Sequence, residues 1–144
     1  MPERKTLEKA RKAKREGKAP STQAGAFVEE EIEHIRAGKH GARSAKQAIA
    51  IGLSKARRAG VNLPPPPKTA SARTKRSASR KLAKGTRPSA ARSRAAKAAL
   101  EDEPRSAASP MALSRQATRA ARRRPASARK ASARKAAKTR ARRR

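Results

Sequence analysis

The sequence lacks cysteine, tryptophan and tyrosine, and it holds a single phenylalanine among 144 residues. Without cysteine there can be no disulfide, thiolate zinc site or cysteine nucleophile. Without aromatic side chains there is little that could stack on the bases of a single strand. No apolar run approaches the roughly 20 residues that span a bilayer, and the first residues lack the apolar stretch of a secretory signal. We therefore expect a cytoplasmic protein that does not enter membranes.

Negative charge is also scarce, with 10 acidic side chains against 41 lysines and arginines and a formal net charge of +31. The hydrophobic fraction of 35% is mostly alanine. Such a composition is typical of segments that cannot offset the cost of ordering the backbone, about 1 to 2 kcal/mol per residue. It predicts a mostly disordered protein with one small all-α module and a long low-complexity basic tail.

The charge is unevenly distributed along the chain. Residues 1–63 carry 15 basic and 7 acidic side chains, whereas residues 64–144 carry 26 and 3. The boundary is Pro64–Pro67, which has no backbone donors and favours a stiff polyproline II spacer. The sequence thus predicts four segments: a basic N-terminal arm at 1–21, an α-helical hairpin at 22–63, the spacer at 64–67 and a disordered, histone-like tail at 68–144.

The first helix of the predicted hairpin begins near Ser21 or Thr22 and ends at Gly38, which can supply a left-handed C-terminal cap. Its apolar stripe consists of Ala24, Val28, Ile32 and Ile35, with Phe27 beside it. The glutamates are expected to cover the rest of the helix surface: Glu29, Glu30, Glu31 and Glu33. Because so small a core is thin, a homodimer through Phe27, Val28, Ile32 and Ile35 is a hypothesis for covering it.

The second helix begins with the capping box Ser44-x-x-Gln47, in which each side chain can accept a backbone hydrogen bond. Gly60 ends it, with Lys55, Arg57 and Arg58 near its C-terminus, where the helix dipole favours cations. Small and apolar residues recur at helical spacing: Ala45, Ala48, Ile49, Gly52, Leu53 and Ala56.

The tail is built of Ala, Ser, Lys, Arg and Pro, with a tandem repeat at 126–130 and 131–135. Ser109-Pro110 is a typical helix start, and a helix from there to just before Pro125 would place Arg115, Arg119 and Arg122 on one face. Phosphate groups could induce that helix by neutralising its charges.

The charge predicts binding to the phosphate backbone of nucleic acid, because neutralised phosphates release condensed counterions. We expect binding without sequence specificity, with duplex DNA favoured, and a location in the nucleoid. The candidate contacts in the hairpin are Lys39, Arg43, Lys46, Lys55, Arg57 and Arg58. Those in the tail are Arg122, Arg123, Arg124, Arg129, Lys130, Arg134, Lys135, Lys138, Arg140, Arg142, Arg143 and Arg144.

The segment from Phe27 to Gly60 resembles a small uncharacterised family of basic bacterial proteins, mainly proteobacterial. The resemblance rests on two runs: FVEEEIEHIRAGKHGARS at 27–44 and KQAIAIGLSKARRAG at 46–60. The family has no established activity, so the resemblance implies lineage and not mechanism. The tail separately resembles linker-histone tails and bacterial histone-like proteins in its composition.

Two other functions stay open on the residues alone. One is an RNA-associated or ribosome-associated protein, since arginine-rich segments also fold onto RNA. The other is an adaptor whose hairpin binds a protein partner while the tail holds it on DNA. A sequence-reading helix-turn-helix would need base-reading side chains at the start of the second helix, where Arg43, Lys46 and Gln47 lie.

No catalytic constellation or cofactor motif is present, so we expect no enzyme activity and no cofactor. Glu31 and His34 have the i,i+3 spacing found in metal sites of helical bundles, and His40 follows in the turn. Because there is no second carboxylate–histidine helix, the sequence assigns no metal ligands.

Overall fold

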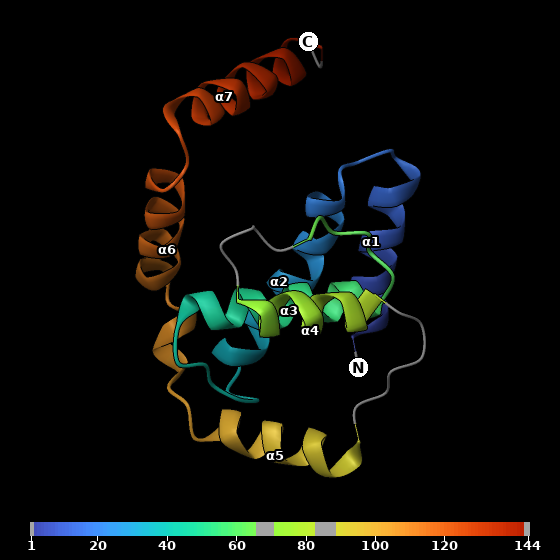
Figure 1. The fold of residues 1–144 in the computed structure, drawn as a ribbon, viewed down its shortest axis with the longest axis vertical. Coiled ribbons are helices and arrows are strands. Elements are labelled where there is room, and N and C mark those ends of the chain that lie inside the picture. Colours follow the sequence, from blue (N-terminus) through green and yellow to red (C-terminus); the bar gives the residue numbers. More distant parts are fainter. Residues whose placement is uncertain (1, 66–70, 83–88, 143–144) are drawn as a thin grey trace. The chain divides into compact units, whose positions relative to one another are not determined.

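The computed structural model describes residues 2–65, 71–82 and 89–142, and in these ranges it holds seven α-helices, one short 3₁₀ helix and no strand (Figure 1). The elements are α1 Arg4–Arg15, α2 Pro20–Arg36, α3 Ala45–Arg58, α4 Ala72–Leu82, α5 Ala90–Glu101, η1 Arg105–Ala108, α6 Pro110–Arg122 and α7 Ala126–Ala141. The chain divides into two units, residues 1–109 and 110–144. The all-α class is confirmed, whereas the prediction of a mostly disordered chain is wrong.

That prediction failed because it considered only how little apolar area alanine adds to a core. Alanine is also the strongest helix former, and lysine and arginine rank close behind it. No described helix is interrupted by a proline in its interior, and several prolines lie at helix starts. Pro20 and Pro110 are the first residues of α2 and α6, and Pro125 directly precedes α7. Alanine-rich segments therefore form α4, α5, α6 and α7 within residues 68–144, which were expected to be a disordered tail with at most a phosphate-induced helix before Pro125.

The predicted N-terminal arm is the helix α1, and it packs against α2. Thr6 and Ala10 lie on its buried face. Ala10 belongs to an apolar cluster that includes Phe27, and Leu7 packs against that cluster. Thr6 and Ala10 are small residues one turn apart, so this face of α1 can lie close against a neighbouring helix. Gly17 then ends the turn after α1 with a positive φ of 67°.

The predicted hairpin corresponds to α2 and α3, which pack against each other. Gly38 and Gly60 follow the two helices with φ of 76° and 86°, as expected for left-handed caps. Ser44 Oγ accepts from the Gln47 N–H at 3.2 Å, so the predicted N-cap is confirmed. The Gln47 side chain accepts from the Arg43 N–H at 2.8 Å, one residue earlier than in a standard capping box.

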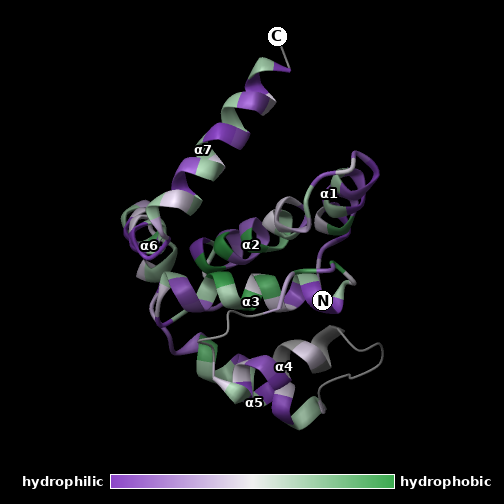
Figure 2. Ribbon diagram, turned by 45° about the horizontal axis from the view of Figure 1, so that its top comes forward, coloured by the Kyte–Doolittle hydropathy of each residue, from purple (hydrophilic) through white to green (hydrophobic). Residues whose placement is uncertain are grey.

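Small side chains line the face of α3 that meets α2. The buried residues of α3 are Ala45, Ala48, Gly52 and Ala56, all of them in the predicted stripe. At Gly52 the helices approach so closely that a Cβ atom there would lie 2.7 Å from the Val28 Cα. The core therefore rests on close backbone approach as well as on large side chains, and Figure 2 shows its most hydrophobic positions on α2 and α3.

The first unit has two buried apolar clusters. One consists of Ala10, Ala24, Phe27, Ala56, Val61 and Leu63. The other consists of Ile35, Ala42, Ala48, Ala107 and Ala108. Phe27 and Ile35 are both fully buried within one chain. The apolar area that motivated a homodimer is thus largely covered without a second copy.

Part of the predicted tail belongs to this core. Ala107 and Ala108 of η1 are buried, and η1 packs against α2 and α3. The loop after α2 is fastened to the same region, because the Gly41 N–H donates to the Leu100 carbonyl at 2.7 Å and the Ala42 N–H to the Pro104 carbonyl at 3.1 Å. Folded structure therefore continues beyond the predicted spacer at Pro64–Pro67, where a disordered tail was expected. Pro66 and Pro67 themselves lie outside the described residues.

The second unit contains α6 and α7, in which no residue is buried. The segment between Ser109-Pro110 and Pro125, where phosphates were expected to induce a helix, forms the helix α6, Pro110–Arg122. Among the described residues, no helix of either unit combines the length and the apolarity needed to cross a membrane.

Candidate nucleic-acid interface and a buried charged cluster

Two glutamates of α2 are buried in the middle of the first unit. Glu31 has no exposed surface and Glu30 is 3% exposed. Glu31 lies four residues after Phe27 and four before Ile35, so it shares the core-facing side of the helix with them. The expectation that all the glutamates cover the outer surface is therefore wrong for these two. The buried stripe runs through Ala24, Phe27, Glu31 and Ile35, and it leaves Val28 and Ile32 half-buried.

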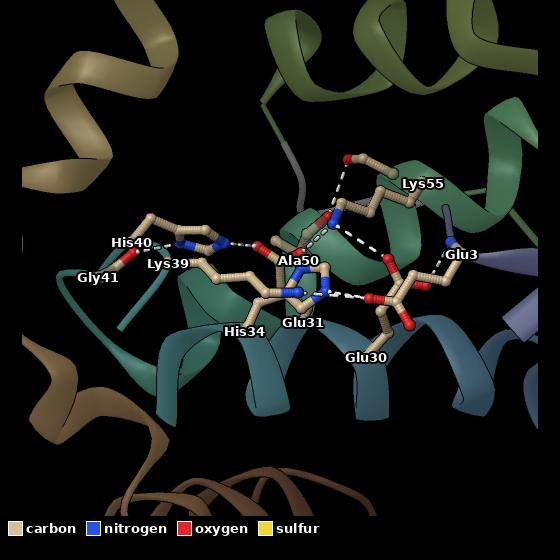
Figure 3. Close-up of polar contacts among 10 residues, drawn as sticks. Glu3, Glu30, Glu31, His34, Lys39, His40, Gly41, Ala50 and Lys55 are labelled. Atoms are coloured by element: carbon tan, nitrogen blue, oxygen red, sulfur yellow. Dashed lines mark hydrogen bonds and ion pairs between the residues drawn. The ribbon is translucent and has the colours of Figure 1, made fainter. Parts of the chain in front are cut away.

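Lys55 of α3 provides the nearest positive charge to both carboxylates (Figure 3). Its Nζ lies 2.6 Å from Glu31 Oε2 and 3.6 Å from Glu30 Oε1. The Lys55 side chain is 21% exposed, less than half the 47% of Lys9 or the 56% of Lys39. Its ammonium is therefore used inside the fold, although the sequence placed Lys55 among the candidate nucleic-acid contacts.

His40, in the loop before α3, approaches Glu31 from the other side. Its Nε2 lies 3.3 Å from Glu31 Oε1, and its Nδ1 is 3.0 Å from the carbonyl oxygen of Gly41. A carbonyl oxygen only accepts, so Nδ1 carries the hydrogen in this contact. The two oxygens of Glu31 thus face different partners, one towards His40 and one towards Lys55.

Glu3 joins the N-terminus of the chain to this cluster. Its carboxylate accepts from His34 Nε2 at 3.0 Å and from Lys39 Nζ at 3.4 Å, and its backbone N–H donates to Glu30 Oε2 at 3.2 Å. The hydrogen bond from His34 lowers the pKa of the Glu3 carboxyl below its usual value, and the nearby Lys39 lowers it further. Segments about thirty residues apart in the sequence are thereby fastened together.

The other candidate contacts of the hairpin lie closer to the surface. Arg43 is 83% exposed and pairs with Glu103 at 3.3 Å. Lys46 and Arg58 are exposed on α3. Arg57 is partly buried and donates to the Pro64 carbonyl at 3.4 Å. The structure therefore does not gather the predicted basic residues of the hairpin into one surface patch.

The basic residues of the second unit are arranged differently. All of those that the structure describes are exposed: Arg115, Arg119, Arg122, Arg123, Arg124, Arg129, Lys130, Arg134, Lys135, Lys138, Arg140 and Arg142. The predicted contacts Arg143 and Arg144 lie outside the described residues. Arg124 also holds the start of α7, because it donates to the Ala128 carbonyl at 3.3 Å and to Ser132 Oγ at 2.7 Å.

Acidic residues are confined to the first unit. All 10 of them lie within residues 1–109, whereas residues 110–144 carry 14 lysines and arginines and no acidic side chain. Intrachain carboxylates therefore neutralise part of the charge of the first unit and none within the second. A surface of this kind attracts polyanions.

The central segment of the chain is similar to a known family. Residues 22–69 match the family model described as Family of unknown function (DUF6496). The matched segment contains α2 from Thr22 onward, the following loop and α3. It includes every residue of this set: Glu30, Glu31, His34, His40 and Lys55. An uncharacterised family was expected from the same residues. Neither the curated proteins nor the solved structures gave a match to this chain.

Sequence reasoning missed the cluster because it assigned the apolar stripe of α2 to Val28 and Ile32. The spacing Phe27, Glu31, Ile35 is an equally regular helical pattern, and it would have placed one carboxylate in the core. Lys55 lies between the buried Gly52 and Ala56 and so was also close to the core face of α3. No such signal marks Glu3, since its position depends on how α1 packs.

Proposed function

We propose that this protein binds the backbone of nucleic acid, preferably duplex DNA, without sequence specificity, and that residues 110–144 are its main binding surface. The observation that carries the proposal is the presence of 14 basic and no acidic side chains in this unit, with every described one of them exposed. Charges so placed can contact phosphates without first breaking an ion pair within their own unit.

The dimensions of α7 suit this role. Its 16 residues make a rod about 24 Å long, at 1.5 Å per residue. Six basic side chains project from it: Arg129, Lys130, Arg134, Lys135, Lys138 and Arg140. A duplex of the same length carries about 14 phosphates, so a helix following the duplex would find an acceptor for each of these side chains.

Other modes of binding have less support. Gln47, the best base-reading side chain at the start of α3, already accepts a hydrogen bond from the Arg43 N–H. Arg43 itself pairs with Glu103. Phe27 is fully buried, so the one aromatic side chain of the chain is not free to stack on bases. These contacts favour backbone binding over base reading and duplex over single strand.

The finer parts of the proposal follow from the same charge. We place the protein in the nucleoid, where it would neutralise and compact DNA as histone-like proteins do. We also propose that the protein is related to basic, mainly proteobacterial proteins, because the segment 27–60 resembles them. The matching family model, described as a family of unknown function, is consistent with this relation.

The test is the salt dependence of binding to duplex DNA, structured RNA and single-stranded DNA of matched length. One variant of the full chain replaces the six basic residues of α7 by glutamine. A matched control replaces six exposed basic residues of α1: Arg4, Lys5, Arg11, Lys12, Lys14 and Arg15. Both variants lose the same charge, so they separate a binding surface from a general charge effect.

We expect the wild type to bind duplex DNA most tightly, with a steep loss of affinity as salt rises. The α7 variant should lower the slope of log K against log salt by up to about 5, because each phosphate contact contributes about 0.9. The α1 control should change the slope much less. Equal effects of the two variants would refute a dedicated surface in the second unit, and tighter binding to RNA would refute DNA as the preferred ligand.

A further inference from the structure

We propose that Glu31, His34 and His40 form a binding site for a divalent transition-metal ion of the zinc class. The chain has only two histidines, and the fold brings both to the same buried glutamate. One ligand atom from each of the three residues lies within 4.8 Å of the other two. The two imidazole rings are perpendicular, with centroids 6.3 Å apart. This site is independent of the proposed nucleic-acid binding, and the sequence alone did not assign it.

The first support is the state of the Glu31 carboxylate. It is fully buried, and neither of its oxygens accepts a hydrogen bond of good geometry from the described residues. Oε2 is within 2.6 Å of Lys55 Nζ, which leaves Oε1 facing His40. A buried carboxylate needs positive charge or hydrogen bonds around both oxygens, and Oε1 has only the histidine beside it.

The second support is the orientation of His40. Its Nδ1 donates to the Gly41 carbonyl, so Nε2 is the ring nitrogen that can offer a lone pair. This nitrogen faces Glu31 Oε1 at 3.3 Å. Two lone pairs do not face each other stably unless a positive species lies between them. Tetrahedral zinc with bonds of about 2.0 to 2.1 Å separates its ligand atoms by about 3.3 Å, which matches this distance.

The third support is the outer shell. Histidines that bind metals almost always donate their other ring N–H to a carboxylate or a backbone carbonyl. His40 donates to the Gly41 carbonyl, and His34 contacts the Glu3 carboxylate at 3.0 Å through Nε2. Each ring is thus fixed in the way that leaves one nitrogen for a metal. The pattern holds for both histidines, although they come from a helix and from a loop.

Charge and ligand type define the cation. Glu30 and Glu31 are buried against one ammonium, that of Lys55, so the cluster has room for a further positive charge. Two imidazoles and one carboxylate form a donor set typical of zinc sites that keep an open position for water. Both histidine side chains are 15% exposed, so an ion can reach the site from solvent.

The experiment uses the full chain without an affinity tag, freed of metal by a chelator. Cobalt(II) is titrated in and followed by visible absorption, and zinc is then added to displace it. The variants are Glu31→Gln, His34→Gln and His40→Gln, with Glu33→Gln as matched control, since Glu33 is an exposed glutamate of the same helix. We expect one-to-one binding in the wild type and the control, and at least about ten-fold weaker binding in each of the other three. Glu3→Gln, which removes an outer-shell partner, should weaken binding by about 10-fold or more.

A second measurement protects the test from variants that fail to fold. In the wild type, the imidazole nitrogens of His34 and His40 are observed by nuclear magnetic resonance before and after zinc is added. We expect both rings to shift together at one equivalent of zinc. The proposal is overturned if the wild type shows no saturable binding, as it would if a protonated His40 alone held Glu31. It is overturned equally if the ring signals do not respond, or if a folded His40→Gln variant binds as tightly as the wild type.

Discussion

Replacement of Lys55 by methionine should be among the most destabilising single changes in the first unit. Methionine keeps much of the length of the side chain but removes the ammonium that lies 2.6 Å from Glu31 and 3.6 Å from Glu30. Two carboxylates with at most 3% exposure would then share no lysine. Removing one partner of a buried ion pair costs about 3 to 5 kcal/mol, and because Lys55 is 21% exposed we expect about 3 kcal/mol.

The assay is urea unfolding of the full chain, followed by circular dichroism, in a buffer with chelator so that no metal compensates for the lost charge. Neither α6 nor α7 of the second unit has a buried residue, so the cooperative part of the transition reports the first unit. The double variant Lys55→Met with Glu31→Gln removes a charge of each sign. It should be more stable than the sum of the two single effects predicts, by at least about 1 kcal/mol.

Lys46→Met is the matched control, because Lys46 is exposed on the same helix. It should change the free energy of unfolding by less than about 0.5 kcal/mol. The reasoning is refuted if Lys55→Met is as mild as the control, or if the effects of the Lys55 and Glu31 changes simply add. Either result would mean that solvent already reaches these carboxylates.

Three further changes test the packing of the first unit by the same urea assay. Gly52→Ala should lower the free energy of unfolding by about 1 to 2 kcal/mol, because its Cβ would lie 2.7 Å from the Val28 Cα, although alanine favours a helix by about 1 kcal/mol; a stabilised variant would show that the helices can move apart. Ser44→Ala should cost about 1 kcal/mol through loss of the N-cap, and Ser44→Asp should restore it. Ala108→Asp should cost at least about 2 kcal/mol, since residue 108 is fully buried, and an unchanged stability would show that η1 is not part of the core.

The hairpin could be predicted in detail because its signals are local. Glycines past the ends of α2 and α3, the Ser44 cap and the small-residue stripe of α3 each depend on neighbours within a few residues. The rotation of α2 about its axis could not be predicted in this way. Both candidate stripes have helical spacing, and only the packing of α1 and α3 decides which one is buried.

The two candidate sites differ in the same respect. The basic surface of the second unit was expected from composition, since its charges are exposed whatever the conformation of α6 and α7. The buried cluster depends on contacts between four residues: Glu31 of α2, Lys55 of α3, His40 of the loop between these helices, and Glu3, which directly precedes α1. Spacing along the chain indicated only one part of it, the Glu31–His34 pair.

The sequence by itself determined the helical class, the caps of the hairpin and the segregation of charge, because alanine content, capping residues and net charge act locally or through composition. Only the tertiary structure decided that Glu30 and Glu31 are buried, that Lys55 serves them, and that alanines near residue 108 complete the core. The physical reason is that a side chain becomes buried only when a second element packs against its own. A carboxylate on a helix is solvated until another helix covers it, and its chemistry changes at that point.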